Sequence, residues 1–233
     1  MANILMVVSS ADSLTMKDGS AHPTGFWAEE LVVAHRTLRD AGHTVQLSSP
    51  GGVKPTVDQV SLDPQQAGGE EKAAAFRAYL EEIDDELSAP RILAHVDPAA
   101  YDAVVLPGGH GPMADLHANK DLGRLLIAAN NEGKIIAPFC HGPAGLLSAV
   151  DDGGTFAFEG RRLTVFTNEE ELSGGTGENT PWFVETELRQ KGAIVETGAA
   201  WASVVVRDEN LVTGQNPQSS EDVAKEVIAA LAE

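Results

Sequence analysis

The chain has one cysteine among its 233 residues, and it has no long apolar run. One cysteine can form no disulfide within the chain, which favours a reducing compartment. No stretch approaches the ~18 apolar residues that span a membrane. The start, residues 1–8, lacks the basic residues and the long apolar stretch of a signal peptide. We therefore expect a cytoplasmic protein that does not enter a membrane.

Basic residues are also scarce. Lys and Arg together number 16 against 35 Asp and Glu, which gives a formal net charge of −19. Nucleic acids and anionic membrane surfaces are bound mainly through basic groups. The composition therefore argues against both kinds of partner. The acidic run at residues 81–86 is typical of a solvated face.

Apolar segments of strand length alternate with segments of helical period along the chain. This alternation predicts an α/β fold, in which a mostly parallel sheet carries helices on both faces. In such sheets ligands bind beyond the carboxyl ends of the strands. The predicted strands are residues 4–8, 44–48, 101–106, 134–139, a short pair at 156–163, 193–196 and a hairpin at 201–212. The predicted helices are residues 23–41, 116–131, 146–150, 181–191 and 220–232.

Residues 53–100 interrupt this alternation. They contain a turn-rich piece from Ser61 to Gln66 and an acidic helical pattern over residues 70–87. We interpret them as an insertion near the active site, lying over the pocket, within a single domain of residues 1–233.

The only cysteine lies between a predicted buried strand and a run of small residues, in the segment Phe139-Cys140-His141-Gly142-Pro143. Strand, turn and helix in this order form a nucleophile elbow, with cysteine in place of the usual serine. Such a turn exposes the side chain and directs the next helix N-terminus at it, which favours the reactive thiolate. A lone cysteine is often only a small buried apolar residue. The adjacent histidine and the nearby glycines favour a nucleophile.

Six short motifs occur in one order along nearly the whole chain. They are Thr24-Gly25-Phe26-Trp27-Ala28-Glu29-Glu30, Ser61-Leu62-Asp63-Pro64, Leu106-Pro107-Gly108-Gly109-His110-Gly111, Phe139-Cys140-His141-Gly142-Pro143, Phe166-Thr167-Asn168-Glu169-Glu170-Glu171 and Leu211-Val212-Thr213-Gly214-Gln215-Asn216-Pro217. With them the chain resembles the DJ-1/PfpI superfamily and, within it, the Hsp31-like glyoxalase III branch. The resemblance implies a flavodoxin-like α/β fold.

The superfamily places a glutamate of the first helix beside the cysteine, and this chain offers Glu29 and Glu30. On an ideal helix Glu30 falls within the apolar arc, whereas Glu29 lies on the polar side. A carboxylate on an apolar face must be protonated, paired or functional, because an unpaired buried charge is very costly. We therefore assign Glu30 as the acid and base beside Cys140, with a pKa raised by desolvation. Glu29 is interpreted as a surface residue.

The resemblance also implies a carboxylate behind His141. Glu171 matches that position best and Glu170 is the second choice. Because Glu169 precedes them, three consecutive glutamates leave the assignment open. We predict that His141 and Glu171 act together with Cys140.

The turn Gly108-Gly109 resembles the oxyanion site of the family. Glycines let backbone N–H groups approach a developing oxyanion, and the N–H of His141 can supply a second donor. His110 follows the turn, and we interpret it as closing the pocket or capping the turn.

Other classes of protein use related chemistry. Class I glutamine amidotransferases share the cysteine turn, but they need a histidine far downstream, and His141 is the last one in this chain. A cysteine peptidase of the superfamily stays open, although those enzymes resemble shorter chains that build the site between subunits. A redox sensor or holdase chaperone also stays open, because an accessible, acidic thiol is readily oxidised. No metal site is expected, since His22, His110 and His117 contain no close-spaced pair of ligands.

The resemblance implies a cofactor-free enzyme for small reactive aldehydes, chiefly 2-oxoaldehydes such as methylglyoxal. Cys140 would add to the aldehyde, Glu30 and His141 would move a proton between two substrate carbons, and water would release lactate without glutathione. A protein deglycase or an isocyanide hydratase is the alternative at the level of substrate. We expect a small aldehyde as partner, with no cofactor, no nucleic acid and no membrane. A homodimer and unfolded client proteins stay open.

Overall fold

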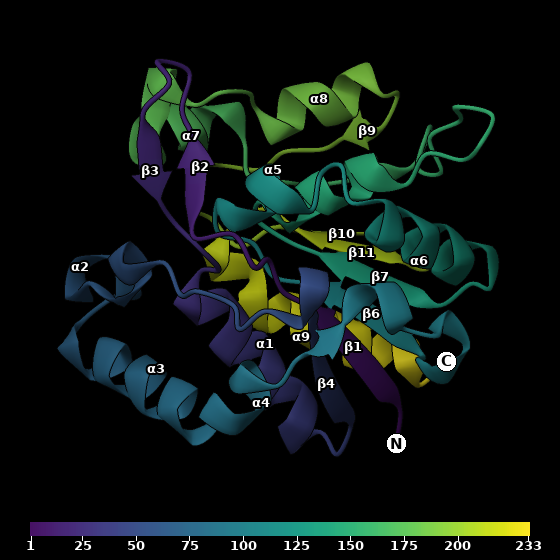
Figure 1. The fold of residues 1–233 in the computed structure, drawn as a ribbon, viewed down its shortest axis with the longest axis horizontal. Helices are drawn as coiled ribbons and strands as arrows, with labels where there is room; N and C mark the ends of the chain where they lie inside the picture. The colour runs from purple at the N-terminus through teal and green to yellow at the C-terminus, as the bar shows by residue number, and fades with distance from the viewer.

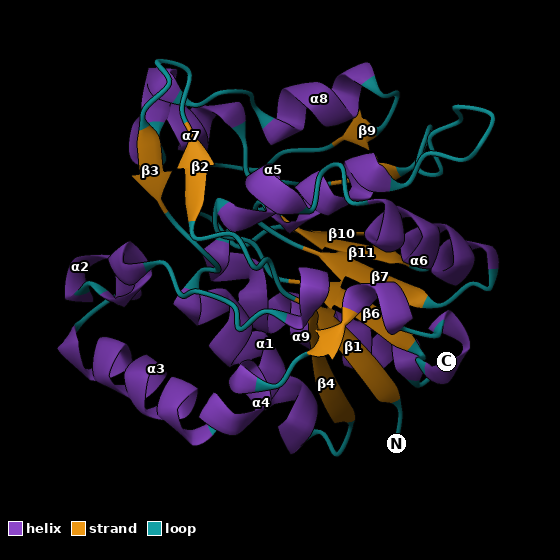
Figure 2. Ribbon diagram, viewed as in Figure 1, coloured by secondary structure: helices purple, strands orange, loops and turns teal.

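A seven-stranded sheet forms the centre of the computed structural model, which describes residues 1–233 (Figures 1 and 2). All strands run parallel except β10 at one edge, which is antiparallel to its neighbour. The strands lie in the order β10 (Val205–Asp208), β11 (Leu211–Gly214), β7 (Ile135–Pro138), β6 (Ala103–Leu106), β1 (Asn3–Val7), β4 (Thr44–Ser49) and β5 (Arg91–Ile92). The predicted α/β fold with a mostly parallel sheet is confirmed.

Helices cover both faces of the sheet, and each face has its own apolar core. Side chains alternate along a strand, so Ile4 and Met6 of β1 enter one core while Leu5 and Val7 enter the other. This explains why the strand is a continuous apolar run. The first core contains α1 (Ala28–Asp40), α3 (Glu70–Glu82) and α9 (Ser220–Leu231). The second contains α5 (Gly111–Asp115), α6 (Lys120–Asn131), the 3-10 helix Gly142–Ser148 and α8 (Val184–Gln190).

The first helix begins later than predicted. The sequence indicated residues 23–41, but α1 starts at Ala28 because the preceding residues are held in extended backbone. The Phe26 N–H donates to the Thr56 carbonyl at 2.9 Å, and Phe26 forms a parallel bridge with Val57. This long-range pairing outweighs the local helix propensity and keeps these residues extended. The helix ends, as predicted, before Gly42, which has a φ of 87°.

Several short elements differ from the predictions. The strand pair predicted at 156–163 is absent, since β8 (Arg162–Leu163) pairs instead with β9 (Ile194–Val195). The helix predicted at 146–150 is part of the 3-10 helix Gly142–Ser148. Sequence periodicity did not indicate the hairpin of β2 (Ser13–Thr15) and β3 (Ala21–Pro23), nor α5 or α7 (Asn168–Gly174), because each is too short for a period to appear.

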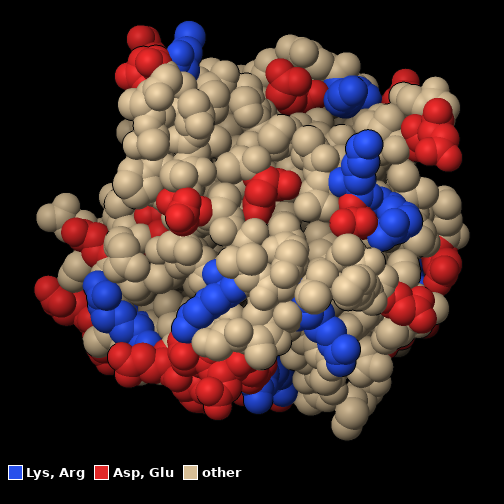
Figure 3. Space-filling model, in the orientation of Figure 1, with Lys and Arg blue, Asp and Glu red and all other residues tan.

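The segment from residue 53 to residue 100 lies mainly beside α1. The acidic helix predicted at 70–87 is broken at Ile83 into α3 and α4 (Asp84–Ser88). α3 buries Phe76 and Tyr79 in the first core, and its acidic side chains face solvent, where they gather along the lower edge of the view in Figure 3. Of the short helix α2 (Pro64–Ala67), Gln66 lines the site described below. No helix combines the length and apolar character needed to cross a membrane.

Candidate active site

The site lies at the carboxyl ends of β6 and β7, near the point where the strand order changes direction. β1 pairs with β4 on one side and with β6 on the other, and such switch points are where parallel α/β sheets bind ligands. The turn after β6 approaches the turn after β7 very closely. A Cβ at Gly108 would lie 2.6 Å from the His141 nitrogen, so only glycine allows this approach.

Cys140 directly follows β7 in a strained backbone conformation. Its φ is 54°, a left-handed value that is uncommon for residues other than glycine. Two hydrogen bonds hold it there: its N–H donates to the Gly214 carbonyl at 2.9 Å, and its carbonyl accepts from the Phe166 N–H at 2.9 Å. This is the geometry of a nucleophile elbow, in which a strained turn aims the side chain beyond the sheet.

The thiol of Cys140 is more buried than the sequence indicated, since only 3% of the residue is exposed. Burial, and next the neighbouring Glu30 carboxyl, raise the pKa of the Cys140 thiol well above its ordinary value. The N–H groups of Gly109 and His141 face the sulfur and act in the opposite direction. The expected accessible, acidic thiolate is therefore not what the resting site holds. The thiol keeps its proton until a base accepts it.

Glu30 points from the first turn of α1 into the same space and is fully buried. Its Oε2 accepts a hydrogen bond of 2.6 Å from the Gly108 N–H, while its Oε1 is buried without a conventional partner. Desolvation raises the pKa of Glu30 to about 8, although Gly108 and the Cys140 thiol partly oppose that rise. Glu30 is therefore mostly protonated at neutral pH. Glu29 is only partly buried and makes no contact with the cysteine.

His141 lies between the thiol and a second carboxylate. Its Nδ1 is 3.3 Å from Cys140 Sγ, and its Nε2 is 2.6 Å from Glu171 Oε2. Burial, and next the nearby His110, lower the pKa of His141. A neutral His141 that donates Nε2–H to Glu171 carries its lone pair on Nδ1, facing the thiol. The ring is thus set to accept a proton from Cys140.

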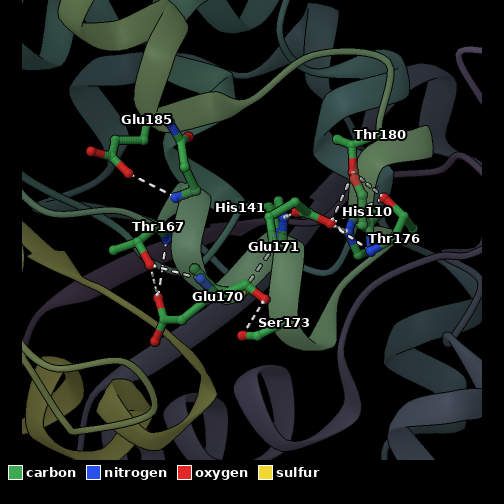
Figure 4. Close-up of polar contacts among 12 residues, drawn as sticks. His110, His141, Thr167, Glu170, Glu171, Ser173, Thr176, Thr180 and Glu185 are labelled. Atoms are coloured by element: carbon green, nitrogen blue, oxygen red, sulfur yellow. Dashed lines mark hydrogen bonds and ion pairs between the residues drawn. The ribbon is translucent and has the colours of Figure 1, made fainter.

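Glu171 is held in its ionised form by hydrogen bonds. Its carboxylate accepts from His141, from His110 Nε2 at 3.1 Å, from the Thr176 N–H at 2.6 Å and from the hydroxyls of Thr176 and Thr180 (Figure 4). Burial alone would raise the pKa of Glu171, but hydrogen bonds and charge from the two histidines lower it below its usual range. A carboxylate so held fixes the ring of His141.

Two connected hollows give access to this site. The inner one has a volume of about 40 Å³ and contains Cys140, His141 and His110 in its wall. The outer one has a volume of about 350 Å³ and reaches His22 on the β2–β3 hairpin and Asn179. The two share the wall residues Trp27, Gln66, His110, Gly174 and Gly175. No Lys or Arg lines either hollow.

Comparison with known proteins identifies the family. The DJ-1/PfpI family matches residues 22–230. The chain belongs to the DJ-1/PfpI family.

The DJ-1/PfpI relatives include two named enzymes. The chain is 28% identical to "Glyoxalase 3" of Candida albicans over 99% of this chain and 98% of that protein. It is 29% identical to "Protein/nucleic acid deglycase HchA" of Pseudomonas aeruginosa, over 95% of this chain and 78% of that protein. The crystal structure of glyoxalase III from Candida albicans superposes with a TM-score of 0.83 at 27% identity, covering 98% of this chain and 97% of that chain. The predicted resemblance to the Hsp31-like glyoxalase III branch is confirmed.

The fold brings all the predicted site residues of this DJ-1/PfpI protein together, but two of them have other contacts than expected. The Gly108 N–H is bonded to Glu30, so of the two glycines only Gly109 directs its N–H at the sulfur. His110 makes no side-chain cap bond to α5 and instead donates to Glu171. The predicted set is Cys140, His141, Glu30, Glu171, Gly108, Gly109 and His110.

Sequence reasoning missed the aromatic wall of the site and the role of Glu170, a third buried glutamate. Trp27, Phe166 and Trp201 line the inner hollow. Nothing in the sequence around Trp201 indicated a site. Glu170, by contrast, had a readable signal: Thr167-x-x-Glu170 is a capping box, and both of its hydrogen bonds form at the start of α7.

His110, His141 and Glu171 form the one group with the donor set of a metal site, their ligand atoms lying within 4.8 Å of one another. The 2.6 Å separation between His141 and Glu171 is a hydrogen bond. It is shorter than the roughly 3.3 Å that separates two ligands of one zinc ion. The donors of both histidines already serve the carboxylate, so we interpret the group as a hydrogen-bond network.

Proposed function

We propose that this protein converts 2-oxoaldehydes such as methylglyoxal to 2-hydroxy acids, without glutathione or another cofactor. The observation that carries the proposal is the position of Cys140 between two proton-exchanging groups. His141 Nδ1 lies 3.3 Å from the sulfur, and the buried Glu30 carboxyl, with a pKa raised to about 8, also contacts the thiol. The similarity to Glyoxalase 3 of Candida albicans over nearly the full chain supports it.

In the first step the sulfur attacks the aldehyde carbon. The thiol passes its proton to His141 Nδ1 as the carbon–sulfur bond forms, which compensates for its raised pKa. Negative charge then develops on the aldehyde oxygen. The N–H groups of Gly109 and His141, which face the sulfur, stabilise that oxygen. The oxygen takes up the proton of the Glu30 carboxyl, which leaves Glu30 ionised and His141 protonated, and the product is a hemithioacetal.

In the second step a hydrogen moves between the two reacting carbons. Glu30, now ionised, removes the hydrogen from the carbon bonded to sulfur as a proton, while protonated His141 gives its proton to the oxygen of the neighbouring carbon, and an enediol forms. Glu30 then returns its proton to the neighbouring carbon, and the hydroxyl on the carbon bonded to sulfur gives its proton to His141. The product is a thioester of the 2-hydroxy acid. A carboxyl with a pKa near the working pH exchanges protons well in both directions. Water then cleaves the thioester. His141 returns its proton to the sulfur, Glu30 takes up one proton of the water, and the 2-hydroxy carboxylate and one proton are released.

The size and charge of the inner hollow define the substrate class. Its volume of about 40 Å³ gives room for roughly three or four water-sized groups. That matches a three-carbon 2-oxoaldehyde rather than a sugar. Because no Lys or Arg lines the hollows, phosphorylated aldehydes would find no cation. We infer a small, uncharged substrate.

The test is lactate formation from methylglyoxal in the absence of any thiol cofactor. Cys140→Ser keeps the size of the side chain but replaces the nucleophile by a much weaker one, so kcat/KM should fall by at least about 10³-fold. Far-UV circular dichroism and Tm should match wild type. If Cys140→Ser retained a substantial fraction of the activity, Cys140 would not be the nucleophile and the proposal would fail.

Deglycation is the second candidate, supported by the similarity to HchA of Pseudomonas aeruginosa. The same thiol could attack an aldehyde already attached to an amino group, and the outer hollow of about 350 Å³ could receive the attached side chain. Release of lactate from methylglyoxal-treated N-acetylarginine would test this. A cytoplasmic location, a homodimer and a chaperone activity on unfolded proteins stay predictions, as does the absence of nucleic-acid binding.

A further inference from the structure

A strained tryptophan stands at the mouth of the inner hollow. Trp201 is the third residue of a turn that is closed by a hydrogen bond from the Ala202 N–H to the Ala199 carbonyl at 3.2 Å. Its φ is 63°. This turn position with a positive φ normally requires glycine, and a bulky aromatic residue there is a true outlier. Backbone strain of this kind persists only where the surrounding structure enforces it.

Glu170 and two neighbouring amides enforce this conformation. Glu170 Oε1 accepts the Trp201 N–H at 2.7 Å, and also accepts from Gln215 Nε2 at 3.2 Å and Asn216 Nδ2 at 2.8 Å. Asn216 in turn donates to the Ala202 carbonyl at 2.7 Å. All three polar residues are fully buried. They belong to two of the six sequence motifs, and the proposed reaction gives none of these three residues a role.

The strained turn places the indole ring over the site. Trp201 lines the inner hollow together with Cys140, although it is 42% exposed and therefore also faces solvent. Its ring packs edge-on against Phe166 with centroids 5.6 Å apart, and Phe166 lies 4.5 Å from the ring of His141. On the other side it contacts Gly174, where a Cβ would lie 2.5 Å from the indole. The ring thus contacts both Phe166 and Gly174.

We propose that Trp201, held by Glu170, is the wall that limits the size of the electrophile admitted to Cys140. Glu170 is a positioning residue in this arrangement, since it contacts neither the sulfur nor the hollow. The consequence for turnover, a preference for methylglyoxal over bulkier 2-oxoaldehydes, rests on the proposed function. The limit on access to the sulfur is independent of the proposed function.

Because Cys140 is the only cysteine, labelling of the intact chain measures access directly. Iodoacetamide and the bulkier N-phenylmaleimide are compared by mass spectrometry under native conditions. Trp201→Ala should raise the N-phenylmaleimide rate at least about 10-fold relative to the iodoacetamide rate. Trp182→Ala is the matched control, because Trp182 packs on His117 outside the hollow, and its ratio should stay at the wild-type value.

Kinetics give the second readout. The ratio of kcat/KM for phenylglyoxal to that for methylglyoxal should rise at least about 10-fold in Trp201→Ala. Trp201→Gly should behave alike and keep the wild-type Tm, because glycine adopts the positive φ without strain. It therefore serves if Trp201→Ala folds poorly. Glu170→Gln should shift both ratios in the same direction by a smaller factor, and should add little in combination with Trp201→Ala.

The outcomes separate the two proposals. If both Trp201 variants label with N-phenylmaleimide at the wild-type rate, Trp201 is not the wall and the inference is overturned. Suppose that the N-phenylmaleimide rate rises in the Trp201 variants as expected, but neither they nor the wild-type protein convert either aldehyde. Trp201 then limits access to Cys140, and the proposed function fails. A Glu170→Gln protein with unchanged ratios would remove Glu170 from the arrangement.

Discussion

Two buried glutamates contact Cys140 and His141, and their surroundings give them different charge states. Glu30 is mostly protonated at neutral pH, whereas Glu171 is ionised. Glu30 receives one strong hydrogen bond, from the Gly108 N–H, and keeps an oxygen without a conventional partner. Glu171 accepts from two histidines and from Thr176 and Thr180. Burial raises the pKa of Glu30 to about 8, whereas the donors around Glu171 outweigh burial and lower its pKa.

The comparison shows that burial by itself does not decide ionisation. Desolvation penalises both carboxylates, and the number of donors aimed at each one decides the outcome. Glu30 is left able to exchange a proton at neutral pH, and Glu171 is left ionised there. One can act as acid and base, while the other can only orient and stabilise a histidine.

The largest loss of activity is expected for Glu30→Gln, which tests the different roles of the two glutamates. Glutamine keeps the volume but cannot exchange a proton, so kcat/KM for methylglyoxal should fall by at least about 10²-fold. Glu29→Gln is the control one residue away, and because Glu29 makes no contact with the cysteine it should stay near wild type in activity and Tm. Loss of activity in Glu29→Gln alone would reverse the two assignments.

A smaller effect is expected for Glu171→Gln. The amide cannot accept all the donors that the carboxylate accepts, so His141 should lose its fixed orientation and tautomer. A partner that orients a functional histidine is worth roughly 10- to 100-fold in activity, which is the expected loss in kcat/KM. Glu169→Gln changes the exposed neighbour and should leave kcat/KM unaltered. An active Glu171→Gln protein would leave His141 without its proposed support.

The pH dependence of stability should differ in sign between the two glutamates. The pKa of Glu30 is raised from 4.5 to about 8, so between these values the native state holds a proton that the unfolded chain has lost. Stability from this group therefore falls as pH rises through that window. Compared with Glu30→Gln, wild-type Tm should drop by about an extra 10 °C between pH 5 and pH 8.

Glu171 behaves in the opposite sense. Its lowered pKa contributes stability above the unfolded value of 4.5, and that contribution is lost as pH falls below it. Glu171→Gln should therefore flatten the acid limb of the Tm curve below pH 4.5. Equal pH profiles for the two variants would contradict the assigned charge states.

The smallest effect is expected from removing one donor of Glu171. Thr180→Val deletes the 3.3 Å hydrogen bond to Glu171, together with the shorter bonds of the same hydroxyl to Thr176 and to the Gly177 carbonyl. Each such bond is worth about 1 kcal/mol, so Tm should fall by roughly 4–8 °C and kcat/KM by a few-fold. Thr197→Val alters an exposed threonine and should change neither. A loss as large as that of Glu171→Gln would mean that Thr180 alone keeps the carboxylate ionised.

Much of the central sheet could be predicted from the sequence. β1, β4, β6 and β7 and the last helix, α9, fall where apolar runs or helical period indicated them. The position of Glu30 on the buried face of α1 was also correct, although the start of that helix was not. These features follow from spacing within one segment, which the sequence states directly.

The glutamates after Thr167 were harder to assign. Three consecutive carboxylates carry no information on which one meets His141, because neighbouring helix residues point about 100° apart and the phase of α7 depends on its cap. Once Thr167 caps the helix, Glu171 points to His141 (Figure 4). Glu170 accepts the hydrogen bond of the Trp201 N–H.

The sequence by itself determined the alternation of strands and helices, the place of Cys140 at the end of a buried strand and the apolar setting of Glu30, because periodicity and turn residues are local properties. Only the tertiary structure decided that the Cys140 thiol keeps its proton, that Gly108 serves Glu30 while Gly109 faces the sulfur, and that Trp201 stands over the site. Those facts depend on burial and on contacts between segments far apart in the chain. No pattern within a single segment encodes them.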